Sequence, residues 1–377
     1  MKILYDCTYL RNQYTGVDIY FFNLIKCILS IDQTNHYFIL VDSRFETKFL
    51  INELKSYSNY QIIKIYSPLP LQILYSSFFI PIFLKIKKIN IYHNPYFFGP
   101  ISKLLCNKTK IIITVHDVYH WAIPEFRNRL FNIIWRVFSD RAVKAADSVI
   151  VISNQTKLDV LKYIKIDERK IHLIYQALNS DLEFDESFKI EGRIKKFELT
   201  ENNYILAVGT LLPSKGYSDL IKSFDLLLKN PLLDNYKLVL VGNDSNSYAS
   251  VLKNLVKSLG IKDGSVIITG YIQNDDLIEL YKSASLFVCP SYYEGFGLPL
   301  LEAMKFGKPI IARDVSSIAE ILDNSGLLFS DFNDLHDKIK LVLGDPNLSN
   351  IMKTNGYKRL KDFSWHQTAI KTLKLYL

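Results

Sequence analysis

The sequence contains few of the residues that would set it apart from ordinary globular proteins. Its four cysteines are far apart and form no CxxC pair, which argues against a disulfide framework or a zinc site and fits a reducing cytoplasm. Glycine and proline number only 15 and 12 in 377 residues, too few for a fibrous or low-complexity chain. No Asp-x-Asp pair follows an apolar strand and no His/Cys cluster has ligand spacing, so we expect no required metal.

Long uninterrupted hydrophobic runs are also missing. The first apolar stretch is too short for a signal peptide and is interrupted by Asp6. Residues 65–84 carry no charge, but they include Pro68, Pro70 and Pro81, which would leave backbone groups unsatisfied in lipid. We therefore expect a mostly apolar helix of a soluble domain over residues 71–88, not a membrane-spanning helix.

The composition indicates two domains of ordinary globular type. Hydrophobic residues make up 49% and charged residues 22% of 377 residues, enough for two sizeable cores. The 46 basic and 38 acidic residues give a net charge of +8, which favours anionic partners such as phosphates, nucleic acid or an acidic membrane face. The charge alone does not choose among these partners.

Short apolar runs rich in β-branched residues alternate with helical periodicity, which predicts parallel sheets covered by helices. In the N-terminal half the expected strands are 2–5, 37–41, 61–65, 89–93, 111–115 and 148–152, with helices that include 18–29 and 131–145. In the C-terminal half the expected strands are 204–208, 237–241, 266–269, 286–288 and 309–312, and the expected helices are 217–228, 248–259, 275–283 and 299–306.

The predicted fold class is therefore α/β, with two doubly wound Rossmann-like domains at residues 1–180 and 200–360. The charged stretch between Asn179 and Asn203 has no apolar run and is the expected linker. Parallel sheets bind ligands beyond the carboxyl ends of their strands, so the expected site is a cleft across which the two domains face each other.

The most informative segment runs from Ser291 to Met304. A Gly-x-Gly loop follows a buried strand, and Pro299 then opens a helix, where its missing N–H costs nothing. The helix N-terminus is a candidate anion site made of the N–H groups of Phe296, Gly297 and Leu298. Glu302 could accept both hydroxyls of a ribose, and Glu294 could reach the group beyond the phosphate. A Gly-x-Gly loop or a surface glutamate means little alone, but the combination predicts a nucleotide that carries a hydroxyl-rich group.

Two further residues are candidates because they follow strands. Lys215 lies in a loop with Gly209 and Gly216 and could neutralise a leaving diphosphate; the alternative is an ordinary exposed lysine. His116 ends an apolar strand, a place from which it could contact a reacting group. For Asp117, a role in capping the next segment and a functional role both stay open.

The spacing from Glu294 to Glu302 resembles the E-x7-E signature of family 4 (group 1) glycosyltransferases, retaining nucleotide-sugar enzymes with the GT-B fold. Residues 111–117, residues 207–216 and the pair Gly270-Tyr271 are similar to other segments of that family. The resemblance implies that Glu302 binds the donor ribose, that Glu294 binds the donor-sugar hydroxyls and that the amides of residues 296–298 meet the diphosphate. It also implies roles for Gly209 and Lys215 at phosphate, for His116 beside the reacting sugar, for Tyr271 near the base, and for Gly16 near donor phosphate or acceptor.

The resemblance also implies a mechanism and exposes a departure. It implies front-face attack, with the departing phosphate taking the acceptor's proton, and a C-terminal helix, residues 361–377, that packs back on the N-terminal domain. Many relatives carry a second basic residue where this chain has Thr210 and Ser214. Arg313 and Arg127 are the candidates to replace it.

The N-terminal half is aromatic and basic. Phe78, Phe79, Ile80 and Phe83 precede Lys85, Lys87 and Lys88, and a second cluster runs from Trp121 to Arg136. A surface that meets an anionic membrane and a core helix with lysines at its end both fit this pattern. No nucleic-acid recognition module is visible.

Together these features predict a cytoplasmic, metal-independent glycosyltransferase, with peripheral contact at the inner face of the plasma membrane as one reading. We expect it to move a hexose from a nucleotide-diphosphate sugar, its co-substrate, to a growing surface polysaccharide such as lipopolysaccharide, or to the lipid-linked carrier, with no other cofactor. A nucleotide-sugar epimerase and a non-catalytic assembly partner are the alternatives. The donor base, the sugar, the acceptor and the linkage stay open.

Overall fold

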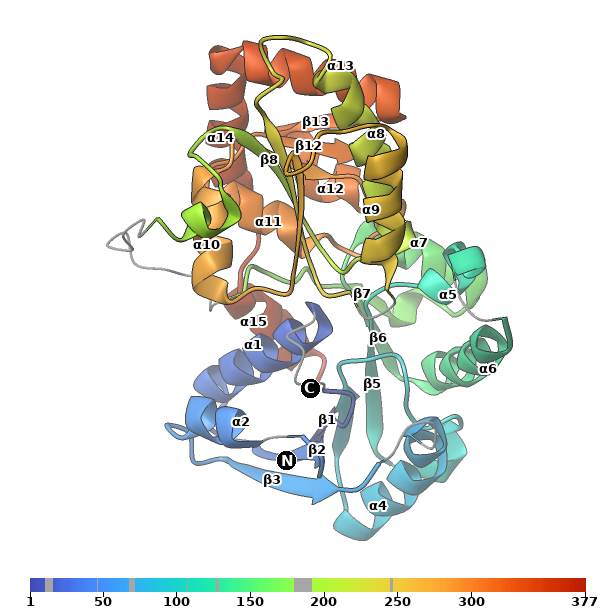
Figure 1. Cartoon of the computed structure of the whole chain (residues 1–377). Coiled ribbons are helices and arrows are strands. Elements are labelled where there is room, and N and C mark those ends of the chain that lie inside the picture. The colour runs from blue at the N-terminus through green and yellow to red at the C-terminus, as the bar shows by residue number, and fades with distance from the viewer. Residues whose placement is uncertain are drawn as a thin grey trace. The chain divides into compact units, whose positions relative to one another are not determined.

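The computed structural model describes residues 1–10, 16–45, 47–67, 72–106, 108–126, 129–179, 192–244 and 247–377. The contacts divide the chain into two compact units, Met1–Ala177 together with Phe363–Leu377, and Leu178–Asp362. Each unit is a parallel sheet with helices on both faces (Figure 1). Within the described residues, no helix combines the length and the apolar character needed to cross a membrane.

The first unit is built on a seven-stranded sheet of order β3-β2-β1-β4-β5-β6-β7, in which every pair is parallel. The strands are β1 (Lys2–Cys7), β2 (His36–Asp42), β3 (Tyr60–Ile65), β4 (Ile91–Asn94), β5 (Lys110–Val115), β6 (Ser148–Val151) and β7 (Ile171–Leu173). The sequence pattern predicted the first six. It missed β7, which has only three residues and therefore no readable period.

Helices cover both faces of this sheet. Figure 1 shows α1, α2 and α15 on one side and α4 and α6 on the other. The α-helices are α1 (Gly16–Ile31), α2 (Thr47–Leu54), α3 (Gln72–Leu74), α4 (Ile80–Lys87), α5 (Tyr119–Ala122), α6 (Arg129–Ala145), α7 (Asn154–Tyr163) and α15 (Trp365–Lys374). Short 3-10 turns lie at η2 (Lys103–Cys106), η3 (Pro124–Phe126) and η4 (Glu168–Lys170).

The helix predicted over residues 71–88 is interrupted. After α3 the chain makes a π-helical turn, η1 (Tyr75–Phe79), before α4 begins at Ile80 with proline in its first turn. Pro81 has no N–H to give to the preceding turn, so the regular α-helical ladder cannot run through this point.

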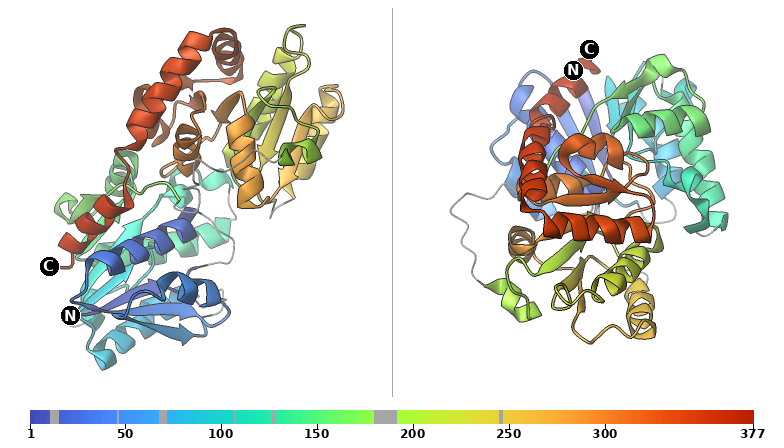
Figure 2. Two further views of the ribbon diagram at one scale, coloured as in Figure 1. Left: turned by 90° about the vertical axis from the view of Figure 1, so that its left-hand side faces the viewer. Right: turned by 90° about the horizontal axis from the view of Figure 1, so that it is seen from above.

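The last residues of the chain belong to the first unit. Helix α15 packs along α1, as the left view of Figure 2 shows. Tyr376 is buried, and its hydroxyl lies 2.7 Å from Nδ1 of the buried His93 in β4. Trp365 packs its ring against Tyr20 of α1. The C-terminal helix is thus part of the core of this unit.

The second unit repeats the architecture with six parallel strands in the order β10-β9-β8-β11-β12-β13. They are β8 (Tyr204–Val208), β9 (Lys237–Val241), β10 (Val266–Gly270), β11 (Leu286–Cys289), β12 (Ile310–Arg313) and the unpredicted, three-residue β13 (Leu327–Phe329). The α-helices are α8 (Tyr217–Leu227), α9 (Tyr248–Ser258), α10 (Asn274–Ser283), α11 (Leu298–Lys305), α12 (Ile318–Leu322), α13 (Phe332–Gly344) and α14 (Pro346–Leu360). Short 3-10 turns lie at η6 (Arg193–Phe197), η7 (Pro213–Lys215) and η8 (Asp323–Ser325).

The predicted fold class is confirmed, and the strand orders explain where a ligand site can form. In each sheet the order reverses beside the first strand of the unit, between β1 and β4 and between β8 and β11. The connections leave neighbouring strands in opposite directions there, which opens a crevice at the carboxyl ends of the strands. The loops that follow β8 and β11 contain Lys215 and Glu294.

Candidate functional site

Two loops meet at the point where the strand order of the second unit reverses. Strands β8 and β11 are paired, with Leu286 opposite Ile205 and Phe287 opposite Leu206. The loops that continue from them also touch, because the Tyr292 N–H donates to the carbonyl oxygen of Ser214 at 2.9 Å. The sheet register therefore brings together two segments that lie about 80 residues apart in the sequence.

The contact between these loops requires a glycine. Gly216 has φ of 68°, and a Cβ atom at this position would lie 2.0 Å from the carbonyl oxygen of Pro290. No side chain fits there without moving the backbone of one of the two loops. The same loop begins at Gly209, whose carbonyl oxygen accepts a hydrogen bond of 2.7 Å from the Tyr217 hydroxyl. The candidate phosphate loop, residues 209–216, is therefore fixed at both ends, by the hydrogen bond to Gly209 and by the close packing of Gly216.

Lys215 and Glu294, both predicted site residues, form an ion pair. Lys215 Nζ lies 2.5 Å from Glu294 Oε1, and the two side chains are 23% and 15% exposed. The Ser291 hydroxyl donates to the same oxygen at 2.7 Å. Both contacts fall on Oε1, and within the described residues no protein group donates to Glu294 Oε2, which is therefore available to a ligand hydroxyl. An ammonium group has three N–H donors, so Lys215 can keep this contact and still donate to a phosphate.

The backbone of Glu294 is fixed by two serines that sequence reasoning missed. The Glu294 N–H donates to Ser316 Oγ at 2.9 Å, and Ser317 Oγ donates to the Glu294 carbonyl at 2.8 Å. Both serines follow β12 and lie more than 20 residues away in the sequence. Only the parallel pairing of β11 with β12 brings them to this loop.

The N-terminus of α11 lies three residues beyond Glu294. Gly297 has φ of 97° and no side chain caps the helix there. The first N–H groups of a helix carry a partial positive charge of roughly half an elementary charge. The side chains of Phe296 and Leu298 are buried, at 2% and 7% exposure, and anchor the turn to the core. The turn at which the anion site is predicted is thus anchored in the core of this unit.

Glu302 lies one turn into α11 and is almost fully buried, at 7% exposure. Burial raises the pKa of this carboxyl to about 6, and the hydrogen bond from Tyr281 opposes the rise. The Tyr281 hydroxyl donates to Oε2 at 2.6 Å, and the Tyr281 ring stacks on Phe306 at 5.2 Å. Tyr281 therefore orients Glu302, and no spacing in the sequence could have paired these two residues.

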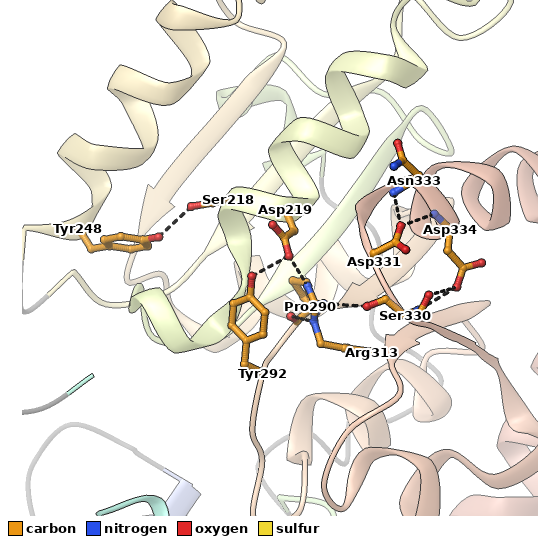
Figure 3. A network of polar contacts seen from close by, with 10 residues as sticks. All are labelled: Ser218, Asp219, Tyr248, Pro290, Tyr292, Arg313, Ser330, Asp331, Asn333 and Asp334. Atoms are coloured by element: carbon orange, nitrogen blue, oxygen red, sulfur yellow. Dashed lines mark hydrogen bonds and ion pairs between the residues drawn. The ribbon is translucent and has the colours of Figure 1, made fainter. Parts of the chain in front are cut away.

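Arg313, a candidate for the second cation, is engaged in a buried ion pair. It ends β12, is 5% exposed, and its Nη2 lies 2.6 Å from Asp219 Oδ2 in the first turn of α8 (Figure 3). Its other nitrogens donate to the carbonyl oxygens of Pro290 and Ser330 at 3.0 and 3.2 Å. The Tyr292 hydroxyl also donates to Asp219, and the Tyr292 ring lies 4.3 Å from the guanidinium carbon.

Through these contacts Arg313 links the start of α8 to the loop that leads to Glu294. A guanidinium suits that task because its planar group can donate to several oxygens at once. Arg127, the other candidate for the second cation, lies outside the described residues. Thr210 is exposed and Ser214 is buried.

The remaining predicted residues are placed as follows. Tyr271 follows β10 in the second unit and is 56% exposed. Gly16 begins α1 and His116 follows β5, so both belong to the first unit. The Asp117 carboxylate accepts the Tyr119 N–H at 2.9 Å, so it caps the turn into α5.

His116 has a defined protonation pattern. It is 5% exposed, and burial lowers its pKa, although the Pro95 carbonyl and Asp117 oppose that shift. Its Nε2 lies 2.8 Å from the carbonyl oxygen of Pro95. A carbonyl can only accept, so Nε2 carries the proton and the neutral ring keeps its lone pair on Nδ1. His116 can therefore accept a hydrogen bond from a hydroxyl group.

No group of three or more His, Cys, Asp or Glu side chains in the described part of the chain is arranged to hold a metal ion. The charges described at the site include those of the Lys215–Glu294 pair, the Glu302 carboxylate and the helix N-terminus.

The chain is similar to known glycosyltransferases. The family model for glycosyl transferases group 1 matches residues 189–359, and the model for Glycosyltransferase Family 4 matches residues 16–182. The O-antigen chain mannosyltransferase B of Escherichia coli is 28% identical over 288 residues, which are 76% of this chain and 74% of that protein. The serotype-specific mannosyltransferase WbdA of Escherichia coli is 28% identical over 271 residues, and the chain spans about a third (32%) of its length.

The fold is shared with solved structures. HepE of Anabaena in complex with UDP-glucose superposes with a TM-score of 0.74 at 17% identity, over 99% of each chain. Such a likeness concerns the fold, whereas the two family models cover nearly the whole sequence. The chain belongs to the group 1, family 4-like glycosyltransferases with the GT-B fold.

Proposed function

We propose that this glycosyltransferase is a retaining, metal-independent hexosyltransferase. It moves a hexose from a nucleoside diphosphate sugar to a growing surface polysaccharide or to its lipid-linked carrier. The observation that carries the proposal is the meeting of Lys215 and Glu294 beside the N-terminus of α11. A cation and helix amides suit a diphosphate, and the adjacent carboxylate suits sugar hydroxyls.

Each group has a task in this proposal. The N–H groups at residues 296–298 and Lys215 hold the diphosphate and stabilise its charge as the bond to the sugar breaks. Glu294 orients the sugar through Oε2, and Glu302 accepts the ribose hydroxyls while Tyr281 holds its other oxygen. No carboxylate is assigned as a nucleophile. The acceptor hydroxyl attacks from the face of the leaving group, and the departing phosphate takes its proton.

The first donor to test is a mannosyl donor, because E. coli O-antigen mannosyltransferases are among the relatives of the chain. HepE was solved with UDP-glucose, which makes UDP-glucose the second choice. We place the protein in the cytoplasm, where nucleotide sugars are available to it. We expect it to make peripheral contact with the inner face of the plasma membrane.

The test is a panel of UDP-, GDP- and dTDP-sugars, measured first for binding by calorimetry and then for transfer to glycan and lipid-linked acceptors. We expect one nucleotide to bind and its sugar to reach an acceptor with its anomeric configuration retained. Glu302→Ala should weaken that binding, whereas Glu320→Ala on α12 should not.

Two outcomes would contradict the proposal. Conversion of the donor sugar without any acceptor would indicate an epimerase. Donor binding without transfer to any acceptor would indicate a non-catalytic assembly partner, which the missing second cation at Thr210 and Ser214 would suit.

A further inference from the structure

The excess positive charge of the chain is concentrated in one stretch. Residues 54–116 contain eight lysines and no aspartate or glutamate, so the remaining 314 residues carry 38 basic and 38 acidic side chains. The net charge of +8 is therefore that of these 63 residues. Three of the lysines, Lys85, Lys87 and Lys88, are exposed at the end of α4.

The same part of the chain exposes large apolar side chains. Leu74, Phe78, Phe79, Ile82 and Ile86 are 44%, 49%, 45%, 58% and 70% exposed. They recur every three or four residues along α3, η1 and α4, so they share one side of this segment. The opposite side holds Ile73, Ser76, Ser77, Ile80 and Leu84, all buried against the unit.

A neighbouring turn extends this apolar surface. The turn η2 packs against α4, and its residues Leu104 and Leu105 are 92% and 46% exposed. Monomeric soluble proteins rarely expose a continuous apolar patch of this kind, and such patches mark contact sites. We call the exposed residues of Leu74–Lys88 together with Leu104 and Leu105 the docking surface. The second aromatic and basic cluster, residues 121–136, lies partly outside the described side chains and is not included.

We propose that the docking surface binds an anionic lipid bilayer. Apolar side chains on one side of a helix, with lysines at its end, match a segment that lies in the membrane–water interface. The absence of any acid from residue 54 to residue 116 complements the negative charge of anionic headgroups.

A second copy of the chain is the less suitable occupant. A two-fold contact would place each lysine-bearing surface against the same surface of its partner, and like charges across an interface repel. A bilayer offers the opposite charge and an apolar interior together. The proposal extends the proposed function, because a lipid-linked acceptor would lie in the same bilayer. Membrane binding is tested without donor or acceptor. A failure of the membrane proposal and a failure of the proposed transferase function are therefore measured separately.

The test is flotation of the purified chain with phosphatidylcholine vesicles that contain or lack phosphatidylglycerol. We expect binding only to the anionic vesicles, and release by salt because screening weakens contacts between exposed charges. Replacement of the three lysines (K85Q, K87Q, K88Q) should lower the partition coefficient on the order of 100-fold. The matched control removes three exposed lysines of the second unit (K253Q, K257Q, K262Q) and should leave it nearly unchanged.

The apolar half of the surface has its own test. Ile82→Ser with Ile86→Ser should lower binding about tenfold, since less apolar area enters the interface. Ile351→Ser with Leu341→Ser is the control, because these residues of the second unit are 57% and 52% exposed. Circular dichroism of all four variants excludes misfolding as the cause.

Three results would overturn the proposal. The first is equal binding to both kinds of vesicle, and the second is equal loss in the paired variants and controls. The third is absence of binding together with a dimer, detected by sedimentation, that the Ile82→Ser and Ile86→Ser changes dissociate.

Discussion

Glu302 is expected to reduce the stability of the fold that contains it. Burial raises the pKa of this carboxyl from an ordinary 4.5 to about 6. The folded state therefore holds the proton more tightly than the unfolded state. The resulting stabilisation is complete below about pH 4.5 and is lost as the pH rises through 6, so the charged form costs about 2 kcal/mol at higher pH.

The change Glu302→Gln removes this cost. A glutamine has the same shape, and its amide oxygen can accept the hydrogen bond from Tyr281. At pH 8 we expect the free energy of unfolding to rise by about 2 kcal/mol, and at pH 4 we expect almost no change. The assay is urea unfolding followed by circular dichroism, with hydrogen exchange in α10 and α11 to assign the transition to this unit.

The same change should weaken the binding of the nucleotide. A hydrogen bond to a charged group is worth about 1.5–3 kcal/mol, so the donor dissociation constant should rise about 10- to 100-fold at pH 8. Glu320→Gln, at a partly exposed position of α12, is the control and should leave both quantities nearly unchanged. A Glu302→Gln protein that is less stable than the parent at pH 8, or a difference that does not depend on pH, would refute the reasoning.

The other predictions concern the two loops. Gly216→Ala should cost at least about 2 kcal/mol more than Gly260→Ala, because the two glycines have φ of 68° and 70° but only the first would place Cβ against a carbonyl oxygen. Equal losses in urea unfolding would count against this contact. Lys215→Gln should lower the turnover number about 10- to 100-fold, whereas Lys229→Gln, an exposed change on the same unit, should not; similar rates would remove Lys215 from the site. Arg313→Met should destabilise the fold by about 3 kcal/mol, since it leaves a carboxylate without its cation; a change below about 1 kcal/mol would show that this ion pair is not structural.

The sequence was sufficient to predict the architecture because the alternation of apolar runs and helical periodicity is long and regular. Strand β8 consists of apolar residues and tyrosine, and β5 has three consecutive isoleucines at its centre, as buried parallel strands should. The three-residue strands β7 and β13 were missed, since their pairing depends on neighbours that the sequence does not identify. The π-helical turn before Pro81 was not predicted, because the sequence was read as one helix over residues 71–88.

The sequence placed Lys215 and Glu294 at one sheet edge but did not predict their contacts. The position of Lys215 after one strand and of Glu294 after another placed them at one sheet edge, yet their ion pair depends on the register of β8 against β11. Arg313 had been a candidate for the second phosphate cation, and its pairing with Asp219 shows why charge alone does not assign a partner. The hydrogen bond from Tyr281 to Glu302 likewise depends on tertiary packing that the sequence does not show.

The most direct measurement of the central claim is a crystal structure of the chain with its nucleoside diphosphate. We predict that the diphosphate lies against the N–H groups of residues 296–298, within hydrogen-bond distance of Lys215 Nζ, and that a ribose hydroxyl donates to Glu302. A diphosphate bound at another sheet edge, or held with no contact to that turn, would contradict the account.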